Sequence, residues 1–298
     1  MTTQIRGDSR RFWHTTPLGP WHRVFIIALL TALVLCSPRP SHSETGPPAC
    51  GETTSVPLGT LGSDKEQRAL LFQQAAACVR EGKARRAVTL FSALIKADPK
   101  DAAAYLNRGS VQATLGEMAL AMSDYNTAIS LDPGAVEAWY DRGTALLQAR
   151  RYERAMSDLT EAIRLKPDLA LAYCNRGFES FQLGRYDEAL ADYTKALELV
   201  PKRLTYCYFS RGTFYLTIGE YQNAVDDFTK AIEQKTSDAI ALSRRGQAFE
   251  GLGQISRALE DFRAALQLDP QLESAREGVG RLGEEQKRPG GGISCGTS

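Results

Sequence analysis

Small and bulky apolar residues recur along this chain with a period of about 34 residues. One column holds only alanine: Ala87, Ala121, Ala155, Ala189, Ala224 and Ala258. Four residues later a bulky apolar column follows: Phe91, Tyr125, Leu159, Tyr193, Phe228 and Phe262. A second small column comes next: Ala128, Ala162, Ala196, Ala231 and Ala265. A fixed period of this length predicts a solenoid of like supersecondary units rather than one globular core.

Within each period the spacing predicts two helices. Trp139, Gly143 and Leu146 are spaced by four and three residues, which places them on one helical face, and Ala155 to Ala162 repeats that spacing. Between the two helices stands a glycine column that would end the first helix: Gly82, Gly116, Gly184, Gly219 and Gly253, with Arg150 as the exception. Prolines close most periods: Pro99, Pro133, Pro167, Pro201 and Pro270.

These columns resemble the tetratricopeptide repeat family over about residues 68 to 272. The third unit matches that consensus best, at Trp139, Gly143, Leu146, Tyr152, Ala155, Leu159, Ala162 and Pro167. The resemblance implies an all-α fold, a right-handed α-solenoid of six helix-turn-helix units. The expected units are about 68–101, 102–135, 136–169, 170–204, 205–238 and 239–272. A cap helix is expected over 273–287, although its three glycines make it a poor helix former.

The sequence before the repeats is typical of targeting. Residues 1–43 carry five arginines and one aspartate, and Val24 to Cys36 is an uncharged run of 13 residues. That length suits a signal-peptide core and is short for a bilayer span of roughly 20 residues. We therefore expect residues 1–43 to be a signal peptide or an amino-terminal anchor, 44–62 a flexible linker, 63–287 the solenoid and 288–298 a disordered tail.

Charge and histidine content narrow the chemistry. Without residues 1–43 the chain has 31 basic and 34 acidic residues, and no basic patch stands out, so nucleic acid is a poor candidate partner. All three histidines, at positions 14, 22 and 42, lie in the targeting segment. Their absence from the repeats removes serine–histidine and cysteine–histidine catalysis and most zinc sites. We expect no cofactor and no metal.

The cysteines suggest no redox motif. Five follow residue 43, none of them in a C-x-x-C motif, and an odd number leaves at least one thiol unpaired or in an intermolecular bridge. Cys78 and Cys207 fall in distant units, so we expect both to pack as small apolar residues. Cys50 and Cys295 lie in the two ends and could pair with each other.

An arginine and an aspartate recur with one offset. In units two to six an arginine is followed sixteen residues later by an aspartate: Arg108 and Asp124, Arg142 and Asp158, Arg176 and Asp192, Arg211 and Asp227, Arg245 and Asp261. The first unit lacks both residues. Because an unpaired charge away from water is costly, we expect each pair to hold its own hairpin together.

The first-helix face beside the core stripe is the candidate partner surface. In the resembled family, first helices line a concave groove that binds peptides. The residues expected there are Asn107, Tyr140, Cys174, Asn175, Phe178, Phe181, Tyr206 and Phe209. Phe178 is unusual, since its column otherwise reads Ala76, Ser110, Thr144, Thr213 and Gln247. Either it packs locally against Phe209 or Leu147, or it belongs to an apolar peptide pocket.

Together these features predict an exported, periplasmic scaffold that binds a protein or peptide in its groove and carries out no reaction. One alternative is a membrane-tethered assembly factor, anchored in the inner membrane through residues 24–36 and facing the periplasm. A second is an enzyme that uses carboxylates only, although every acid that recurs in the repeats has a structural explanation.

Overall fold

A computed structural model describes residue 50 and residues 65–201, 204–235 and 237–287, with side chains to residue 283. Every element in these ranges is an α-helix. The expected signal or anchor and the tail, with Cys295, lie outside them, and so does the linker apart from Cys50. No described helix combines the length and the apolar character needed to cross a bilayer.

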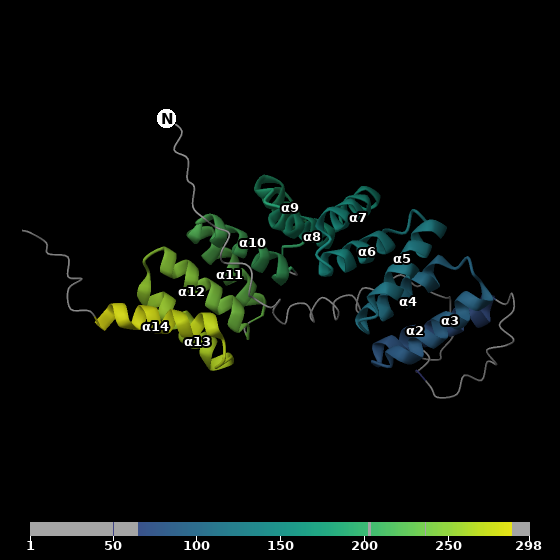
Figure 1. Cartoon of the computed structure of the whole chain (residues 1–298), viewed down its shortest axis with the longest axis horizontal. Coiled ribbons are helices and arrows are strands. Elements are labelled where there is room, and N and C mark those ends of the chain that lie inside the picture. Colours follow the sequence, from purple (N-terminus) through teal and green to yellow (C-terminus); the bar gives the residue numbers. More distant parts are fainter. Residues whose placement is uncertain (1–49, 51–64, 202–203, 236, 288–298) are drawn as a thin grey trace, which may run out of the picture. The chain divides into compact units, whose positions relative to one another are not determined.

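The chain divides into two compact units after Arg150, inside the third expected repeat. In the amino-terminal unit, each helix packs on the next: α2 (Lys65–Arg80), α3 (Ala84–Ala97), α4 (Ala102–Thr114), α5 (Met118–Leu131) and α6 (Val136–Gln148). These helices form consecutive helix-turn-helix hairpins (Figure 1).

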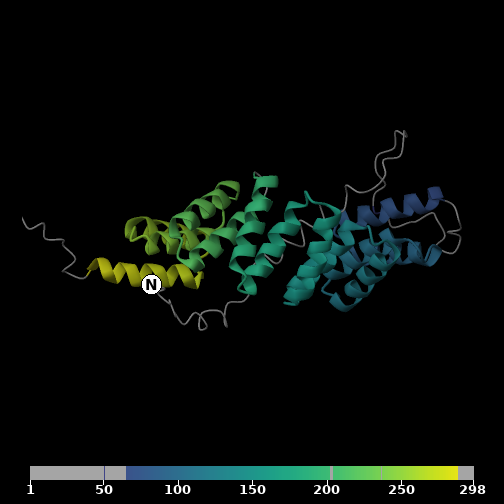
Figure 2. The same ribbon diagram turned by 90° about the horizontal axis from the view of Figure 1, so that it is seen from above.

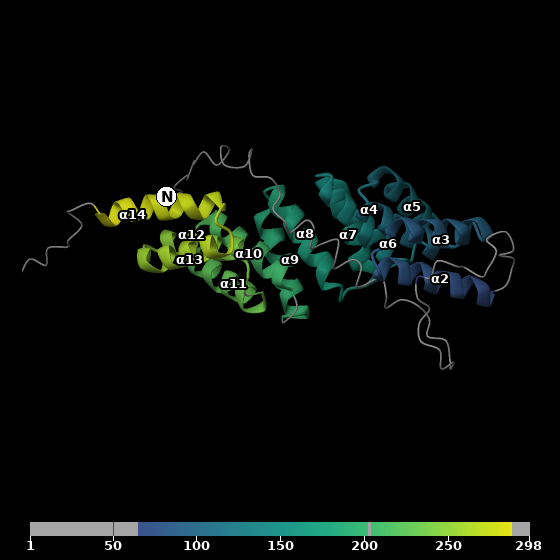
Figure 3. The same cartoon turned by 90° about the horizontal axis from the view of Figure 1, so that it is seen from below.

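The carboxy-terminal unit continues the pattern, as Figure 2 and Figure 3 show from two sides. Its helices are α7 (Tyr152–Leu165), α8 (Ala170–Gln182), α9 (Tyr186–Leu199), α10 (Thr205–Ile218), α11 (Tyr221–Gln234), α12 (Ala239–Gly251), α13 (Ile255–Leu268) and α14 (Glu273–Lys287). The all-α prediction of stacked hairpins is confirmed, and so is the helix expected after the last repeat.

Glycine has two separate roles in these hairpins. The mid-repeat glycines have a left-handed backbone, with φ of +71° to +83°, and Arg150 in the same column has φ +56°. A glycine in the first helix, by contrast, lets the second helix approach. A Cβ at Gly212 would lie 3.0 Å from a ring carbon of Phe228, and one at Gly246 would lie 3.0 Å from Phe262.

The cap helix α14 keeps only half of this arrangement. Gly278 packs so closely on Phe262 that a Cβ there would lie 2.5 Å from the ring, so this glycine helps the helix dock although it disfavours helix formation. Gly280 continues the first-helix glycine column, but a Cβ there would meet nothing within 4 Å. Bidentate hydrogen bonds from Arg281 to Glu250, at 2.7 and 2.8 Å, and buried Leu282 attach α14 to the unit.

A disulfide between Cys50 and Cys78 fastens the segment before the repeats to α2. The Cys50 amide donates a hydrogen bond to Glu81 Oε1 at 2.8 Å, and Lys83 Nζ donates one to the Cys50 carbonyl at 3.2 Å. Cys78 is buried in the core as expected, but its sulfur is bonded to Cys50, so the possible pairing of Cys50 with Cys295 was wrong. The repeat columns carry no information about a partner that lies before the first repeat.

Candidate partner-binding site

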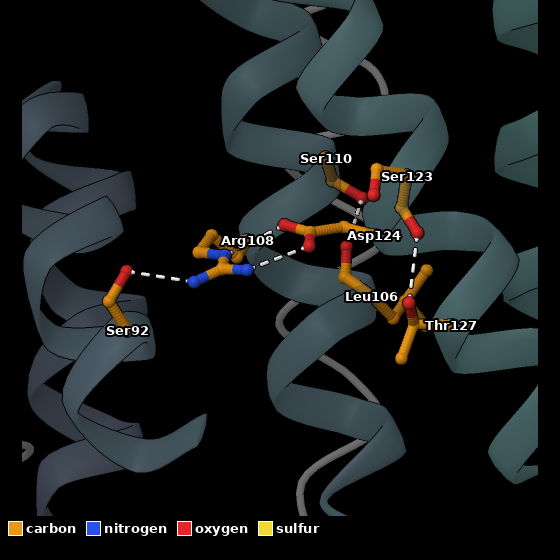
Figure 4. Close-up of polar contacts among 7 residues, drawn as sticks. All are labelled: Ser92, Leu106, Arg108, Ser110, Ser123, Asp124 and Thr127. Atoms are coloured by element: carbon orange, nitrogen blue, oxygen red, sulfur yellow. Dashed lines mark hydrogen bonds and ion pairs between the residues drawn. The ribbon is translucent and has the colours of Figure 1, made fainter. Parts of the chain in front are cut away.

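The recurring arginine and aspartate form bidentate ion pairs within a hairpin. Arg108 on α4 donates from Nε and Nη2 to the two carboxylate oxygens of Asp124 on α5, at 2.7 and 2.8 Å. Its Nη1 reaches back to Ser92 Oγ on α3, at 3.1 Å, so the guanidinium lies between two hairpins (Figure 4). The hydrogen bond to Asp124 raises the pKa of Arg108 above its usual value, since it stabilises the charged form.

The carboxy-terminal unit repeats this geometry three times. Arg176, Arg211 and Arg245 each bind the aspartate sixteen residues later through two bonds of 2.7 to 2.9 Å. Each also donates to a threonine of the preceding repeat, at 3.1 to 3.4 Å: Thr160, Thr194 and Thr229. These arginines therefore hold the repeats together, and their guanidinium groups are occupied by the protein itself.

The residue of the preceding repeat that accepts a hydrogen bond from each arginine was not predicted, although the sequence contains a pattern for it. In the first five repeats the residue directly after the bulky apolar position is Ser92, Asn126, Thr160, Thr194 or Thr229, whereas Arg263 follows Phe262. All five carry a side-chain oxygen that accepts from an arginine, including Asn126, which binds Arg142 Nη1 at 2.8 Å. The pairing of Arg142 with Asp158 would span the two units, and it stays a prediction.

Three of the residues expected in the groove are buried in the carboxy-terminal unit. Cys174 and Asn175 are fully buried, and Phe181 is 8 % exposed. Phe181 packs edge-on against Phe214, with ring centroids 5.7 Å apart, and contacts Tyr186 at 6.0 Å. Their sequence positions indicate the correct helix, but the neighbouring helices cover them. In this fold they support the surface rather than form it.

Partly buried apolar side chains remain on α8 and α10. Phe178 on α8 and Tyr206 and Phe209 on α10 are partly buried against the same core cluster, together with Leu171. Phe209 also stacks edge-on against Phe228 at 5.7 Å, so its ring is held in place. We call these four residues, Leu171, Phe178, Tyr206 and Phe209, the aromatic face.

The two remaining groove candidates lie in the amino-terminal unit. Asn107 on α4 donates its side-chain amide to the Ala103 carbonyl one turn earlier, at 2.8 Å, and Tyr140 on α6 is half-buried. Both belong to the amino-terminal unit, whereas the aromatic face belongs to the carboxy-terminal unit. Their membership of one partner-binding groove stays a prediction.

Two first helices each bury a carboxyl group. Burial raises the pKa of Asp141 on α6 to about 7, against a 2.7 Å hydrogen bond from Ser110 Oγ that favours the charged form. Burial also raises the pKa of Glu179 on α8 to about 9; the nearby Asp158 charge raises it further, and the Arg176 charge lowers it. Neither Glu179 oxygen has a hydrogen-bond partner.

Among the described residues, no three histidine, cysteine or acidic side chains gather as metal ligands would.

Sequence profiles of the tetratricopeptide repeat match residues 72–135, 123–170, 170–203, 205–238 and 239–272. This chain is a tetratricopeptide repeat protein. Such proteins typically act as protein-interaction scaffolds and bind protein or peptide partners. No curated protein matches its sequence.

Several solved structures share the fold. PilW, described as a widely conserved type IV pilus biogenesis factor, aligns at 21 % identity over 72 % of this chain and 99 % of its own, with a TM-score of 0.65. YrrB, described as a TPR protein with an unusual peptide-binding site, aligns at 24 % identity over 63 % and 96 %, with a TM-score of 0.53. In the APC/C hetero-tetramer Cut9–Hcn1 the match has 20 % identity and a TM-score of 0.64, and covers 72 % of this chain but 42 % of that one. At these identities the likeness establishes the fold alone.

Proposed function

We propose that this tetratricopeptide repeat protein is a non-catalytic adaptor, and that the aromatic face on α8 and α10 binds an extended, apolar segment of a partner protein. The aromatic face carries this proposal. Phe178 occupies a column that otherwise holds Ala, Ser, Thr or Gln, so packing within the repeat does not require its ring. Aromatic area left partly open to water commonly marks an interaction surface.

The chemistry of the chain supports binding rather than catalysis. No histidine follows residue 42, and the aspartate that recurs in units two to six belongs to the arginine–aspartate pairs. In four of these pairs the arginine binds the aspartate bidentately, so these aspartates stabilise the fold. Proteins of the same fold include YrrB, whose description names a peptide-binding site, and PilW, described as a type IV pilus biogenesis factor.

The test is a capture experiment with matched variants. The full-length chain is immobilised, a retained protein is identified, and its affinity is measured for wild type, Phe178→Ala/Phe209→Ala and Leu268→Ala. Leu268 on α13 is 47 % exposed and serves as a control for loss of surface apolar area elsewhere in the unit. We expect the double variant to weaken binding by roughly 30-fold or more, since even one buried aromatic residue at a binding hot spot contributes about 2 kcal/mol or more.

Thermal unfolding separates binding from packing. If the double variant unfolds at the wild-type temperature and loses the partner, the aromatic face is a binding surface. If it is destabilised and keeps its affinity, these rings are core and the proposal is wrong.

We further propose that the repeats work outside the cytoplasm, with an amino-terminal tether as the alternative to a cleaved signal. The arginine-rich start followed by the apolar run from Val24 to Cys36 supports export. The Cys50–Cys78 disulfide also supports it, because disulfides persist in oxidising compartments and are rare in the cytosol.

A fusion of alkaline phosphatase after Ala49 tests this localisation. Activity of the fusion is expected only with residues 1–43 present. A fusion that carries these residues but stays in the cytoplasm, where the disulfides of the phosphatase do not form and the enzyme is inactive, would overturn export. Mass spectrometry of the mature amino terminus then distinguishes the alternatives, since a cleaved signal removes residues 24–36 and an anchor keeps them.

A further inference from the structure

Two buried cysteines meet between the fourth and fifth repeats. Cys174 on α8 and Cys207 on α10 are both fully buried, and both are thiols. They belong to the same core cluster, and their side chains interact with each other. The Cys207 thiol also points to the Tyr193 carbonyl, at 4.0 Å.

The repeat columns explain why these thiols meet. At the position of Cys207 every other first helix from α4 to α12 has alanine: Ala104, Ala138, Ala172 and Ala241. At the position of Cys174 the residues vary in size: Leu106, Tyr140, Phe209 and Ser243. In the amino-terminal unit, Leu106 packs in one cluster with Ala138 of the next repeat, which is the same relation that Cys174 has to Cys207. Between repeats four and five, Cys174 thus stands in place of the larger residue and Cys207 in place of the alanine opposite it.

We propose that Cys174 and Cys207 are a redox-active pair that closes into a second disulfide, joining α8 to α10, when the protein meets an oxidising thiol–disulfide couple. With oxidised glutathione as the oxidant, one cysteine thiolate attacks a glutathione sulfur and releases one glutathione thiolate. The other cysteine thiolate then attacks the mixed disulfide and releases the second. The two cysteine thiols lose two electrons and two protons in total, and glutathione disulfide is reduced to two glutathione thiols.

Burial decides when this reaction occurs. The lack of solvent around Cys174 raises the pKa of its thiol well above the usual value, so little thiolate forms in the folded protein. An oxidant also has no direct path to two fully buried sulfurs. The disulfide is therefore expected to form while the chain folds, or when α8 and α10 separate transiently, and to form slowly in the folded reduced protein.

The consequence for binding rests on the proposed function. Cys174 lies one helical turn before Phe178, and Cys207 lies directly after Tyr206 and two residues before Phe209. A covalent bond between the two cysteines fixes the spacing of the helices that carry the aromatic face. Oxidation would then set how far that face can adjust to a partner.

The test needs no partner, so its result is independent of whether the aromatic face binds one. The full-length protein is unfolded, reduced and refolded in reduced and oxidised glutathione, and free thiols are blocked with N-ethylmaleimide. Protease fragments are then analysed by mass spectrometry, with the Cys50–Cys78 link as the internal positive control. We expect a linked pair of fragments containing Cys174 and Cys207, lighter by two hydrogen atoms than the separate thiols. Full alkylation of both, beside an intact Cys50–Cys78 link, overturns the proposal.

A second measurement uses Cys207→Ala, which restores the alanine of its column. Oxidation should raise the unfolding temperature of wild type by about 5 to 10 °C more than that of the variant, since the new link closes a loop of 33 residues. An equal rise in both would show that Cys50–Cys78 accounts for the whole effect, and that the second disulfide does not form. Cys174→Ala provides the same comparison from the other side if Cys207→Ala fails to fold.

Discussion

Glu179→Gln should stabilise this protein, and by an amount that grows with pH. Glu179 is fully buried on α8 with both carboxyl oxygens unpaired, in a column where other first helices carry Val111, Ala145, Phe214 and Ala248. Burial raises its pKa to about 9 from 4.5, so the folded protein holds the proton over a pH range in which the unfolded chain has lost it.

The sign follows from proton linkage. Between these two pKa values the folded state binds one more proton at Glu179 than the unfolded state does, so the free energy of unfolding falls as pH rises. The slope is about 1.4 kcal/mol per pH unit, which sets an upper limit of about 4 kcal/mol between about pH 5 and about pH 8. Glutamine has the shape of the protonated acid and carries no charge at either pH, so the variant lacks this term.

The assay is urea unfolding of wild type and Glu179→Gln at several pH values in that range, followed by helical circular dichroism. Glu198→Gln on the exposed surface of α9 is the control, because its carboxylate is 62 % exposed. The difference between Glu179→Gln and wild type should grow steadily from about pH 5 to about pH 8, whereas the control difference should stay flat. A constant difference for Glu179→Gln would mean that the carboxyl is hydrated, and the assignment of a buried neutral acid would be refuted.

Other substitutions test the contacts between helices by denaturant unfolding. Asp124→Ala should cost about 3 kcal/mol, because it leaves the Arg108 guanidinium without its buried carboxylate. Glu161→Ala, which removes an exposed pair with Arg164, should have a much smaller effect, and equal losses would contradict this explanation. Gly212→Ala should destabilise by about 1 to 3 kcal/mol, since its methyl group would press on Phe228, and Gly280→Ala should stabilise by up to about 1 kcal/mol, since nothing lies near it and alanine favours a helix. If the two glycine substitutions changed the free energy of unfolding in the same direction, this explanation would be wrong.

The fold was predictable because its information is periodic. Columns such as Ala155, Leu159 and Ala162 recur in one register, and each marks a contact that the structure makes again in every hairpin. The offset of sixteen residues likewise locates four ion pairs that the structure holds at 2.7 to 2.8 Å. Regular spacing identifies contacts between like units even when the burial of each residue is unknown.

The parts that were not predicted depend on what covers a residue rather than on its position in a helix. A helical face indicates the direction of Cys174 and Phe181, but α10 lies over both, and only the structure places Cys207 and Phe214 against them. Glu179 would be expected at the surface from its charge alone. The column of hydrogen-bond acceptors for the arginines was not recognised, because it holds serine, asparagine and threonine rather than one residue type.

The Cys50–Cys78 disulfide changes what a cut in the chain would do. A protease that cleaves anywhere between these two cysteines breaks the backbone, yet the piece before the cut stays covalently joined to α2. Whatever precedes Cys50, whether an anchor or a mature terminus, therefore stays attached to the first hairpin until the disulfide is reduced. Release of the repeats by such a cut requires a reductant as well as a protease.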